Sequence, residues 1–256
     1  MIPRGQGVGA IHMHSDYSHD GRDSLEAMRD MCLARGIHFV GLTDHAEDFV
    51  PELFGEYVQH CATVSDNRVR FIPGLEFRLA RGVHLLALGL RQWIAPRTAE
   101  EFFESARTTA QLTVLAHPVL ARYTVPQVVL DHIDGIEVWN ANYNTRYLPD
   151  PRAIRLYHSV ARVRPGVVAT AGLDQHDGSD DREVRVIVGD PSAADPLLEI
   201  KKGQFSNSGR TMQFDSRASI SLQRMRLLTA ARWAFDIGER TQARIAYATH
   251  RMRTRT

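Results

Sequence analysis

Short apolar segments alternate with helix-like segments along most of the chain, and this alternation constrains the fold more than any other feature of the sequence. Repeated β-α units of this kind form a mostly parallel sheet with helices outside it. The apolar segments predict strands at residues 9–14, 39–42, 71–77, 84–88, 112–115, 135–139, 167–171 and 184–188. Helices are predicted at residues 25–35, 99–110, 126–132 and 152–163. This order predicts an α/β protein with a closed or distorted (β/α) barrel, whose functional residues gather at the carboxyl ends of the strands.

Histidines and carboxylates lie at or after the ends of these strands. His12 and His14 are two residues apart on the first strand, so their side chains point to the same face. A single His-x-His pair is a weak signal, because a histidine at a strand end is more often a hydrogen-bonded structural residue. The rest of the chain adds further groups of the same chemistry: Asp20, His45, Glu76, His84, His117, Asp174 and His176. Imidazoles and carboxylates are the ligands that zinc, manganese and iron prefer, so these nine residues predict a metal centre.

From His12 to about Gly203, the order of these motifs resembles the PHP family, the polymerase and histidinol phosphatase superfamily. The Gly-Ser-Asp-Ala-His element of that family is represented by residues 172–176, Gly-Leu-Asp-Gln-His, which keep the Asp and the His. Residues 197–205 are similar to the helix and turn that close such domains. The resemblance implies a distorted seven-stranded (β/α) barrel, a site with up to three metal ions, and hydrolysis of a phosphate ester.

The resemblance also implies how the ligands are shared among two or three divalent ions of zinc, manganese or iron. The first ion is held by His12, His14, Glu76 and Asp174, and Glu76 bridges to a second ion that His84 and His117 also hold. The third ion is held by Asp20, His45 and His176, and relatives have either Asp or His at the position of Asp20. We expect hydrolysis of an ester bond by a metal-bridged hydroxide, with a phosphomonoester as the favoured substrate.

Other polar residues near the ligands are candidates for binding the phosphate or moving protons. Asp44 and His19 lie beside proposed ligands, and either could orient a ligand or protonate the leaving group. We expect the orienting role for Asp44. Arginine binds phosphate through paired hydrogen bonds, and Arg78, Arg122 and Arg146 follow ligand-bearing segments. Of these three, Arg122 is the favoured phosphate clamp.

The sequence divides into a PHP-like domain at residues 1–216 and a segment at residues 217–256 that is predicted to form an appended helix and a polar tail. This segment has nine arginines against Asp236 and Glu239, a net charge of +7, although the whole chain has a formal charge of only +1. Such a basic end can contact nucleic acid or an acidic partner surface. It also fits a solvated helix face and a frayed terminus, because no motif accompanies the charge.

Cysteine content and hydropathy indicate a cytoplasmic protein. The chain of 256 residues has only Cys32 and Cys61, too few for a disulfide framework, and we interpret both as buried thiols in a reducing compartment. No apolar stretch reaches the ~20 residues needed to span a bilayer, and the amino terminus lacks the pattern of a signal peptide. We therefore expect no membrane partner, and a small phosphorylated molecule as the substrate.

Three other functions remain open on the sequence alone. Amidohydrolases also place His-x-His on a first barrel strand, but they typically add a bridging lysine, whereas this chain has Glu76 in that place and lysine only as Lys201 and Lys202. A phosphodiesterase or exonuclease that acts on nucleotides or oligonucleotides would use the same metal centre. Three aromatic residues after a predicted strand could then stack on a base: Trp139, Tyr143 and Tyr147. The third function is that of a PHP-like module that binds metal without turnover.

Overall fold

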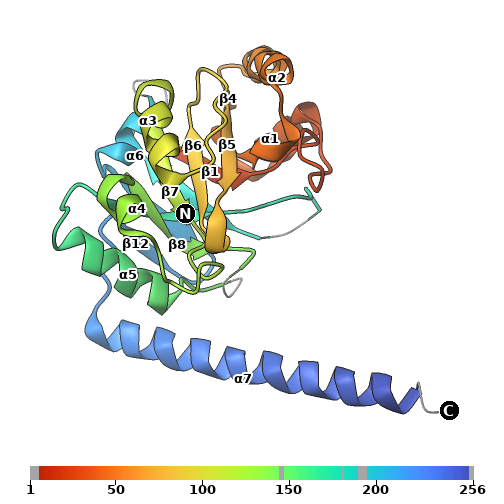
Figure 1. Cartoon of the computed structure of the whole chain (residues 1–256), viewed down its shortest axis with the longest axis vertical. Helices are drawn as coiled ribbons and strands as arrows, with labels where there is room; N and C mark the ends of the chain where they lie inside the picture. The colour runs from red at the N-terminus through yellow and green to blue at the C-terminus, as the bar shows by residue number, and fades with distance from the viewer. Residues whose placement is uncertain (1–5, 144–146, 180–181, 190–194, 254–256) are drawn as a thin grey trace. The chain divides into compact units, whose positions relative to one another are not determined.

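The computed structural model describes residues 6–143, 147–179, 182–189 and 195–253, with side chains described as far as residue 237. Contacts within the chain divide it into two units, Met1–Ser219 and Ile220–Thr256. The first unit contains the strands and the shorter helices (Figure 1). The predicted appended segment at residues 217–256 begins close to this division.

Among the described residues, the strands pair into two six-stranded sheets. The first has the order β12-β11-β10-β1-β2-β4, with β1 at Gly7–Met13, β2 at Phe39–Leu42, β4 at Arg70–Ile72, β10 at Val184–Val188, β11 at Phe205–Gly209 and β12 at Gln213–Asp215. The second has the order β3-β5-β6-β7-β8-β9, with β3 at Asp44–His45, β5 at Gly74–Arg78, β6 at His84–Leu88, β7 at Leu112–Ala116, β8 at Gly135–Asn140 and β9 at Val168–Gly172. Neighbours pair in parallel, except that β6 is antiparallel to β5 and β7, and β10 to β12 form an antiparallel edge beside β1.

The two sheets are connected at two places. Only Thr43 separates β2 from β3, and only Pro73 separates β4 from β5, so the chain passes directly from one sheet into the other at both residues. On the other side, the backbone after β9 runs beside the end of β1, where His14 N donates a hydrogen bond to Gln175 O at 2.9 Å. These connections bring the carboxyl ends of β1, β3, β5 and β9 together. The expected α/β class, with parallel strands and outer helices, is confirmed.

Helices lie on the outside of the sheets (Figure 1). They are α1 at Leu25–Arg35, α2 at Pro51–Val64, α3 at Ala99–Thr109, α4 at Gln127–His132, α5 at Pro151–Ala161 and α6 at Pro196–Lys201, with short 3-10 turns at Ala46–Asp48 and Ala80–Gly82. Local sequence sets their ends. In α1, the Ser24 side chain accepts a hydrogen bond from Ala27 N, and Gly36 ends the helix in a left-handed conformation with a φ of 64°.

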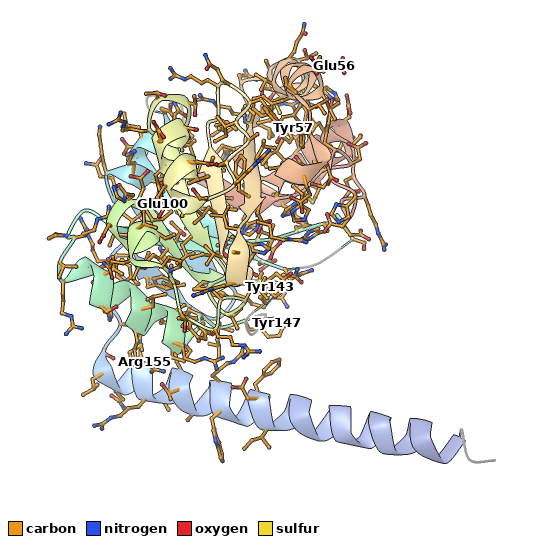
Figure 2. The ribbon with its side chains drawn as sticks, viewed as in Figure 1. Glu56, Tyr57, Glu100, Tyr143, Tyr147 and Arg155 are labelled. Carbon is orange, nitrogen blue, oxygen red and sulfur yellow. The ribbon has the colours of Figure 1, made fainter. Side chains whose placement is uncertain are left out.

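The structure also contains helix α2 and strands β3, β11 and β12, which were not predicted from the sequence. α2 buries Phe54, Tyr57, Cys61 and Val64, which recur at helical spacing, although its first residue is Pro51. Proline is well tolerated at this position, because the N–H group that it lacks would have no partner within the helix. Figure 2 labels Tyr57 on this helix. The β11–β12 hairpin follows α6 and extends the first sheet beyond β10.

The core is built from strands of both sheets and from α6. Its buried residues include Ile11, Phe39, Leu86, Leu88, Leu112, Val114, Val168, Val186, Leu197 and Ile200. Two of them adjoin predicted metal ligands: Ile11 precedes His12, and Leu86 is the register partner of Glu76. Close packing of the core therefore fixes the backbone from which these ligands project.

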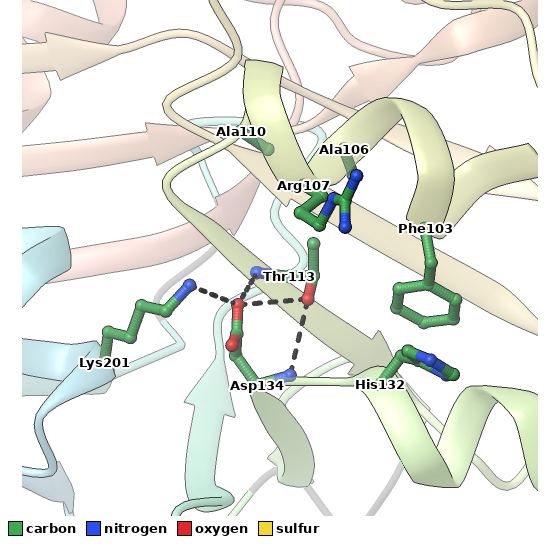
Figure 3. A pocket seen from close by; sticks show the side chains of 8 residues that line it. All are labelled: Phe103, Ala106, Arg107, Ala110, Thr113, His132, Asp134 and Lys201. Carbon is green, nitrogen blue, oxygen red and sulfur yellow. Dashed lines mark hydrogen bonds and ion pairs between the residues drawn. The ribbon is translucent and has the colours of Figure 1, made fainter.

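A polar clamp ties α6 to the amino ends of β7 and β8 (Figure 3). The Asp134 carboxylate accepts hydrogen bonds from Thr113 N at 3.0 Å and Thr113 Oγ1 at 3.1 Å, and it pairs with Lys201 Nζ at 3.0 Å. A pocket beside the clamp is also lined by Phe103 and His132. Lys201 is thus engaged at the ends of the strands opposite to those that carry the predicted ligands.

Most of the described part of the second unit is one long helix, as predicted for the appended segment. α7 spans Leu222–Arg253, and its described side chains include the exposed Leu222, Leu227 and Trp233. Arg232 and Asp236, four residues apart, form an ion pair with a nitrogen-to-oxygen distance of 2.9 Å. In the part of the chain that the structure describes, we find no helix with both the length and the apolar character needed to cross a membrane.

Candidate metal centre

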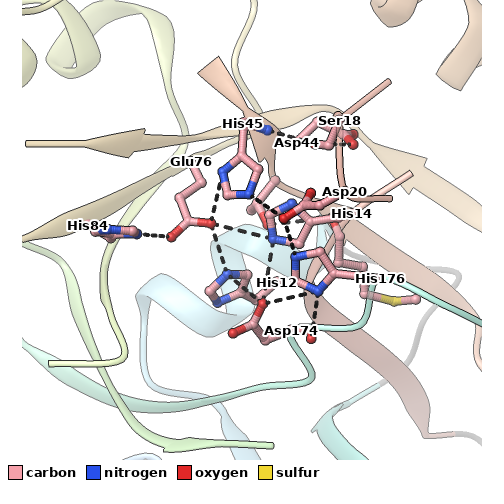
Figure 4. A network of polar contacts seen from close by, with 12 residues as sticks. His12, His14, Ser18, Asp20, Asp44, His45, Glu76, His84, Asp174 and His176 are labelled. Carbon is pink, nitrogen blue, oxygen red and sulfur yellow. Dashed lines mark hydrogen bonds and ion pairs between the residues drawn. The ribbon is translucent and has the colours of Figure 1, made fainter. Parts of the chain in front are cut away.

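The predicted ligands project from neighbouring strand ends into one cluster (Figure 4). They comprise His12 and His14 at the end of β1, Asp20 in the following loop, His45 on β3, Glu76 on β5, His84 on β6, His117 after β7, and Asp174 and His176 after β9. Most are buried, whereas the side chains of Asp20 and His176 are 39% and 23% exposed. The structure thus brings all nine predicted ligands together.

Two carboxylate oxygens face two imidazoles at the centre of the cluster. Glu76 Oε2 lies 3.4 Å from Nε2 of His12 and 3.4 Å from Nε2 of His14. Asp174 Oδ1 lies 3.5 and 3.6 Å from the same two nitrogens. Ligand atoms held about 2.0–2.2 Å from one zinc ion in a tetrahedron are about 3.4 Å apart. The four donor atoms therefore have the spacing of ligands around one metal ion.

The environment of His14 also fits a bound cation. Its side chain is buried, and neither ring nitrogen has a hydrogen-bond partner among the described residues. Buried polar atoms without partners are costly, so such an atom in a native protein needs an explanation. A metal ion at the centre of the cluster would provide the missing partner.

Glu76 presents its second carboxylate oxygen to a different pair of histidines. Oε1 lies 2.6 Å from Nδ1 of His84 and 3.0 Å from Nε2 of His117. One carboxylate therefore faces imidazoles on both sides, as a ligand that bridges two ions would. His84 reaches this position because β6 is antiparallel to β5, which pairs its first residue with Arg78 at the carboxyl end of β5.

A third group of ligands lies at the more exposed edge of the cluster. Asp20 Oδ2 lies 3.1 Å from Nε2 of His45 and 3.2 Å from Nε2 of His176. The rings of His14 and His176 stack with their centroids 4.2 Å apart, and donor atoms of all four residues lie within 4.8 Å of one another. His14 therefore borders this group as well as the central one.

Burial couples the charges of the central group. Burial by itself lowers the pKa of His12, but the carboxylates of Asp174, Glu137 and Glu76 raise that pKa well above its ordinary value. Burial also raises the pKa of Glu76 by itself, yet His12 and hydrogen bonds with neighbouring histidines hold it well below its ordinary value. For His14, burial and then the nearby His12 hold the pKa well below its ordinary value. The ionised carboxylates thus attract positive charge, which either a proton on His12 or a divalent cation can supply.

Glu137 is a buried carboxylate of the site that the sequence did not reveal. Its Oε1 lies 3.0 Å from Nδ1 of His12, and its Oε2 accepts hydrogen bonds from His117 N at 2.7 Å and Asn140 Nδ2 at 2.8 Å. The contact at Nδ1 turns Nε2 of His12 toward the central carboxylates. A Cβ atom on Gly172 would lie 1.6 Å from Oε1, so a larger residue there would push Glu137 away from His12. The available signal was a single glutamate within the apolar run at residues 135–139.

The backbone is irregular at three of the ligands. His12, His117 and Asp174 have positive φ angles of 62°, 20° and 50°. At His12 the pairing of β1 with β2 shifts between Ile11 and Met13, which marks a β-bulge. A regular strand predicts that His12 and His14 share a face; the bulge changes the local geometry, yet both imidazoles reach the same carboxylate oxygens. Left-handed conformations of non-glycine residues cost ~1–3 kcal/mol each and cluster at functional sites.

Asp44 supports the site through the loop that follows β1. Its carboxylate is fully buried and accepts hydrogen bonds from Ser15 N at 2.7 Å and Ser18 Oγ at 2.9 Å. Ser18 Oγ in turn accepts a hydrogen bond from His45 N at 2.8 Å. Burial raises the pKa of Asp44. This arrangement suits the orienting role expected for Asp44, exerted on the backbone of His45 and on the loop that carries Asp20.

The other predicted auxiliary residues lie at or beyond the rim. His19 is 56% exposed along its side chain, its Nδ1 lies 2.8 Å from Asp48 Oδ2, and its ring centroid lies 5.3 Å from that of His45. The hydrogen bond with Asp48 raises the pKa of His19. Arg122 is exposed on the turn after His117, with a φ of 51°.

Of the other two arginine candidates, only Arg78 lies within the described residues. Arg78 is exposed and pairs with Glu47 at 3.7 Å. Arg146 lies outside the described residues. The structure thus gives the geometry of the ligands, while the role of Arg122 as a phosphate clamp stays a prediction.

Comparison with solved structures places the fold among proteins of related architecture. PsfC from Pseudomonas syringae PB-5123 superimposes with a TM-score of 0.58 at 15% sequence identity, covering 90% of this chain and 99% of PsfC. A protein of Bifidobacterium adolescentis ATCC 15703, assigned as a metal-dependent phosphoesterase, gives a TM-score of 0.51 at 16% identity and covers 71% of this chain and 91% of that chain. Endonuclease Q, in complex with a 27-mer duplex with an abasic lesion, gives 0.53 at 19% identity and covers 77% of this chain and 57% of that chain.

Sequence comparison identifies the family. No curated protein sequence matches this chain. The PHP domain, in contrast, matches residues 10–157, which is more than half of the chain and includes seven of the nine clustered ligands. The match agrees with the architecture and with the imidazole and carboxylate groups at the strand ends. This chain therefore belongs to the PHP domain family.

Proposed function

We propose that this protein hydrolyses phosphate esters, with phosphomonoesters as the preferred class, at a centre of two or three divalent metal ions. The main support for this proposal is the position of Glu76, because each of its two carboxylate oxygens faces a pair of imidazoles. Oε2 faces His12 and His14, and Oε1 faces His84 and His117. This arrangement suits two ions that share one carboxylate.

In this proposal, different residues of the site orient the ligands, hold a proton and bind the phosphate. Divalent cations in such a centre lower the pKa of a coordinated water and neutralise the oxygens of a bound phosphate. Glu137 orients His12, while Asp44 holds the loop between His14 and Asp20. His19, at the rim and with its pKa raised by Asp48, can hold the proton that a leaving oxygen needs. In this proposal Arg122 contacts the phosphate from the turn after His117.

The function is tested by a metal-supplemented screen with the full-length protein. Sugar phosphates, nucleoside monophosphates, histidinol phosphate, phosphotyrosine peptides and short oligonucleotides should be compared with zinc, manganese or iron supplied. Turnover of phosphomonoesters is expected, and His14→Ala and Asp174→Ala should lose both metal and rate. His132→Ala, on the exposed end of α4, is the matched control and should keep both. A metal-loaded protein that is inactive on the whole panel would be a binding module without turnover.

A phosphodiesterase that acts on polynucleotides is the second candidate. It is supported by the nine arginines at residues 217–256 and by the fold of Endonuclease Q, whose complex contains a DNA duplex. In this case α7 supplies a nucleic-acid contact through phosphate pairing. Changing both Arg224 and Arg226 to Glu in the full-length chain distinguishes the two cases. If the double change abolishes cleavage of oligonucleotides but not of small substrates, the phosphodiesterase is favoured. If the protein turns over only small substrates, and the double change leaves that turnover unchanged, the phosphomonoesterase is favoured.

The amidohydrolase alternative gains no support from the position of lysine. Lys201 Nζ pairs with Asp134 at 3.0 Å and donates to Gln111 O at 3.2 Å, at the amino ends of β7 and β8. Glu76 occupies the place between the two groups of imidazoles. An assay with amide and amine substrates in the same screen should therefore give no turnover.

We also propose that the protein works in the cytoplasm. Cys32 and Cys61 are both free and buried, and burial raises the pKa of Cys32 to about 12. Thiols with raised pKa values are unreactive, so no disulfide is expected. Mass spectrometry after alkylation of unfolded protein from intact cells should find both cysteines reduced, and localisation of a tagged full-length chain should find it in the cytoplasm.

A further inference from the structure

Tyr143 lies against a predicted metal ligand and is still open to solvent. It follows β8 and is labelled in Figure 2. Its ring centroid lies 4.6 Å from that of His117, with an angle of 52° between the ring planes. The residue is 41% exposed, whereas His117 is 2% exposed. Part of the tyrosine ring therefore packs on the buried ligand while the remainder faces the solvent beside the metal centre.

The backbone of Tyr143 is tied to the ligands through Asn140. The side-chain oxygen of Asn140 accepts hydrogen bonds from Asn142 N at 2.9 Å and from Tyr143 N at 2.8 Å. Its amide nitrogen donates to Glu137 Oε2 at 2.8 Å and to Asp174 Oδ2 at 3.0 Å. Asn140 is fully buried. The same side chain thus sets the position of Tyr143 relative to two carboxylates of the metal centre.

The two other aromatic residues of this segment do not have this placement. Trp139 is fully buried and packs beside Phe214, with ring centroids 6.2 Å apart. Its ring also occupies the space where a Cβ on Gly209 would lie, which makes it part of the core. Tyr147 is 44% exposed, and its carbonyl oxygen accepts a hydrogen bond from Thr211 Oγ1. Of the three, only Tyr143 has a described ring contact with a ligand histidine.

We propose that Tyr143 is a specificity-determining residue that stacks on an aromatic or heteroaromatic ring of the substrate. The proposal rests on the proposed phosphoesterase function and narrows its substrate class to esters that carry a flat ring close to the phosphate. A phosphate bound at the metal centre next to His117 would have the rest of the ester close to the exposed part of the tyrosine ring, because that ring packs against His117. Stacking of a ring on an aromatic side chain changes affinity on the order of tenfold or more.

Binding of two phosphonates that are not hydrolysed tests this inference directly. Phenylphosphonate and methylphosphonate should be titrated calorimetrically into the full-length, manganese-loaded protein and into Tyr143→Phe and Tyr143→Leu. The protein and Tyr143→Phe should bind phenylphosphonate roughly tenfold more tightly than methylphosphonate. Tyr143→Leu should lose most of this preference while its affinity for methylphosphonate and its metal content stay unchanged. Tyr147→Leu is the matched control and should keep the preference.

Each other outcome contradicts the role of Tyr143. Those outcomes are a preference that survives in Tyr143→Leu, an equal loss for both ligands, the same loss in Tyr147→Leu, and no binding of either phosphonate. Turnover of aryl and alkyl phosphates by the same proteins separates this inference from the proposed function. If the metal-loaded protein hydrolyses neither ester, the proposed function fails, and the ratio of phosphonate affinities still decides whether Tyr143 selects a ring.

Discussion

The two ends of the metal centre differ in how far solvent reaches their ligands. At the buried end, His84 and His117 are 6% and 2% exposed and both contact Glu76 Oε1. At the open end, the side chains of Asp20 and His176 are 39% and 23% exposed. The residues of the first end lie on β5, on β6 and directly after β7, whereas Asp20 and His176 lie in the segments that follow β1 and β9. We therefore expect the buried end to hold its cation tightly and the open end to exchange its cation with solvent.

The largest effect is expected from removing the negative charge of Glu76, whose two carboxylate oxygens face both the central imidazoles and those of the buried end. Glu76→Gln keeps the shape of the side chain but removes its negative charge. It should lower kcat on the order of a thousandfold and release metal, because both carboxylate oxygens face imidazoles. Metal analysis and steady-state kinetics measure the two effects, with the exposed Glu104→Gln on α3 as the control. Full metal content and rate in Glu76→Gln would show that it is not a bridging ligand.

A smaller effect is expected when the predicted ligand His12 loses only the contact with Glu137 that orients its ring. Glu137→Gln leaves all nine predicted ligands in place but weakens the contact that orients His12. Changes of such supporting groups typically cost about 10–100-fold in metal affinity or activity. Titration of the metal-free protein with zinc should reveal the weaker binding. If affinity and rate both stayed at the level of the unchanged protein, the orientation of His12 would not depend on Glu137.

The open end should be separable from the rest of the centre. Asp20→Asn should lose the exchangeable cation first, with about a tenfold decrease in rate, because the remaining ligands are neutral imidazoles. Dialysis followed by metal analysis should show a loss from Asp20→Asn that leaves the metal of the buried end in place. Complete loss of metal would mean that the two ends bind their ions as one unit, and the comparison would break down.

The smallest effect concerns the pH dependence at the open end. The hydrogen bond with Asp48 raises the pKa of His19, so the imidazole stays protonated to higher pH. If His19 donates a proton to the leaving group, the rate falls as the pH rises through this pKa. Asp48→Asn removes the partner and lowers the pKa, so the fall should begin at lower pH. NMR titration of His19 and the pH profile of kcat check both steps; a lower pKa with an unchanged profile would exclude His19 as the proton donor.

Sequence patterns were sufficient to predict most members of the cluster, because these residues lie at or after the ends of recognisable apolar strands. His45 follows Phe39–Leu42, and His117 follows Leu112–Ala116. A histidine shortly after an apolar strand is therefore enough to predict both positions as candidate ligands. A strand's direction, however, depends on its neighbours. His84 begins its strand, and it reaches the cluster only because β6 runs antiparallel to β5 and β7.

The supporting residues were harder to predict because their roles depend on contacts between distant segments. Glu137 lies 125 residues from His12, and nothing in the local sequence of β8 indicates that pairing. Trp139 and Tyr143 are four residues apart and both aromatic, yet one is fully buried and the other is 41% exposed. Trp139 is still on the strand, whereas the backbone of Tyr143 lies beyond its end and is held by a hydrogen bond to the Asn140 side chain.

The hairpin formed by β5 and β6 has a consequence for how the centre assembles during folding. Glu76 and His84 are only eight residues apart, whereas His12 is 64 residues from Glu76 and 125 from Glu137. Closing a short loop costs less chain entropy than closing a long one, and local contacts form sooner. The contact between Glu76 and His84 can therefore form within one hairpin, and His12 and His14 join it only when β1 docks between β2 and β10.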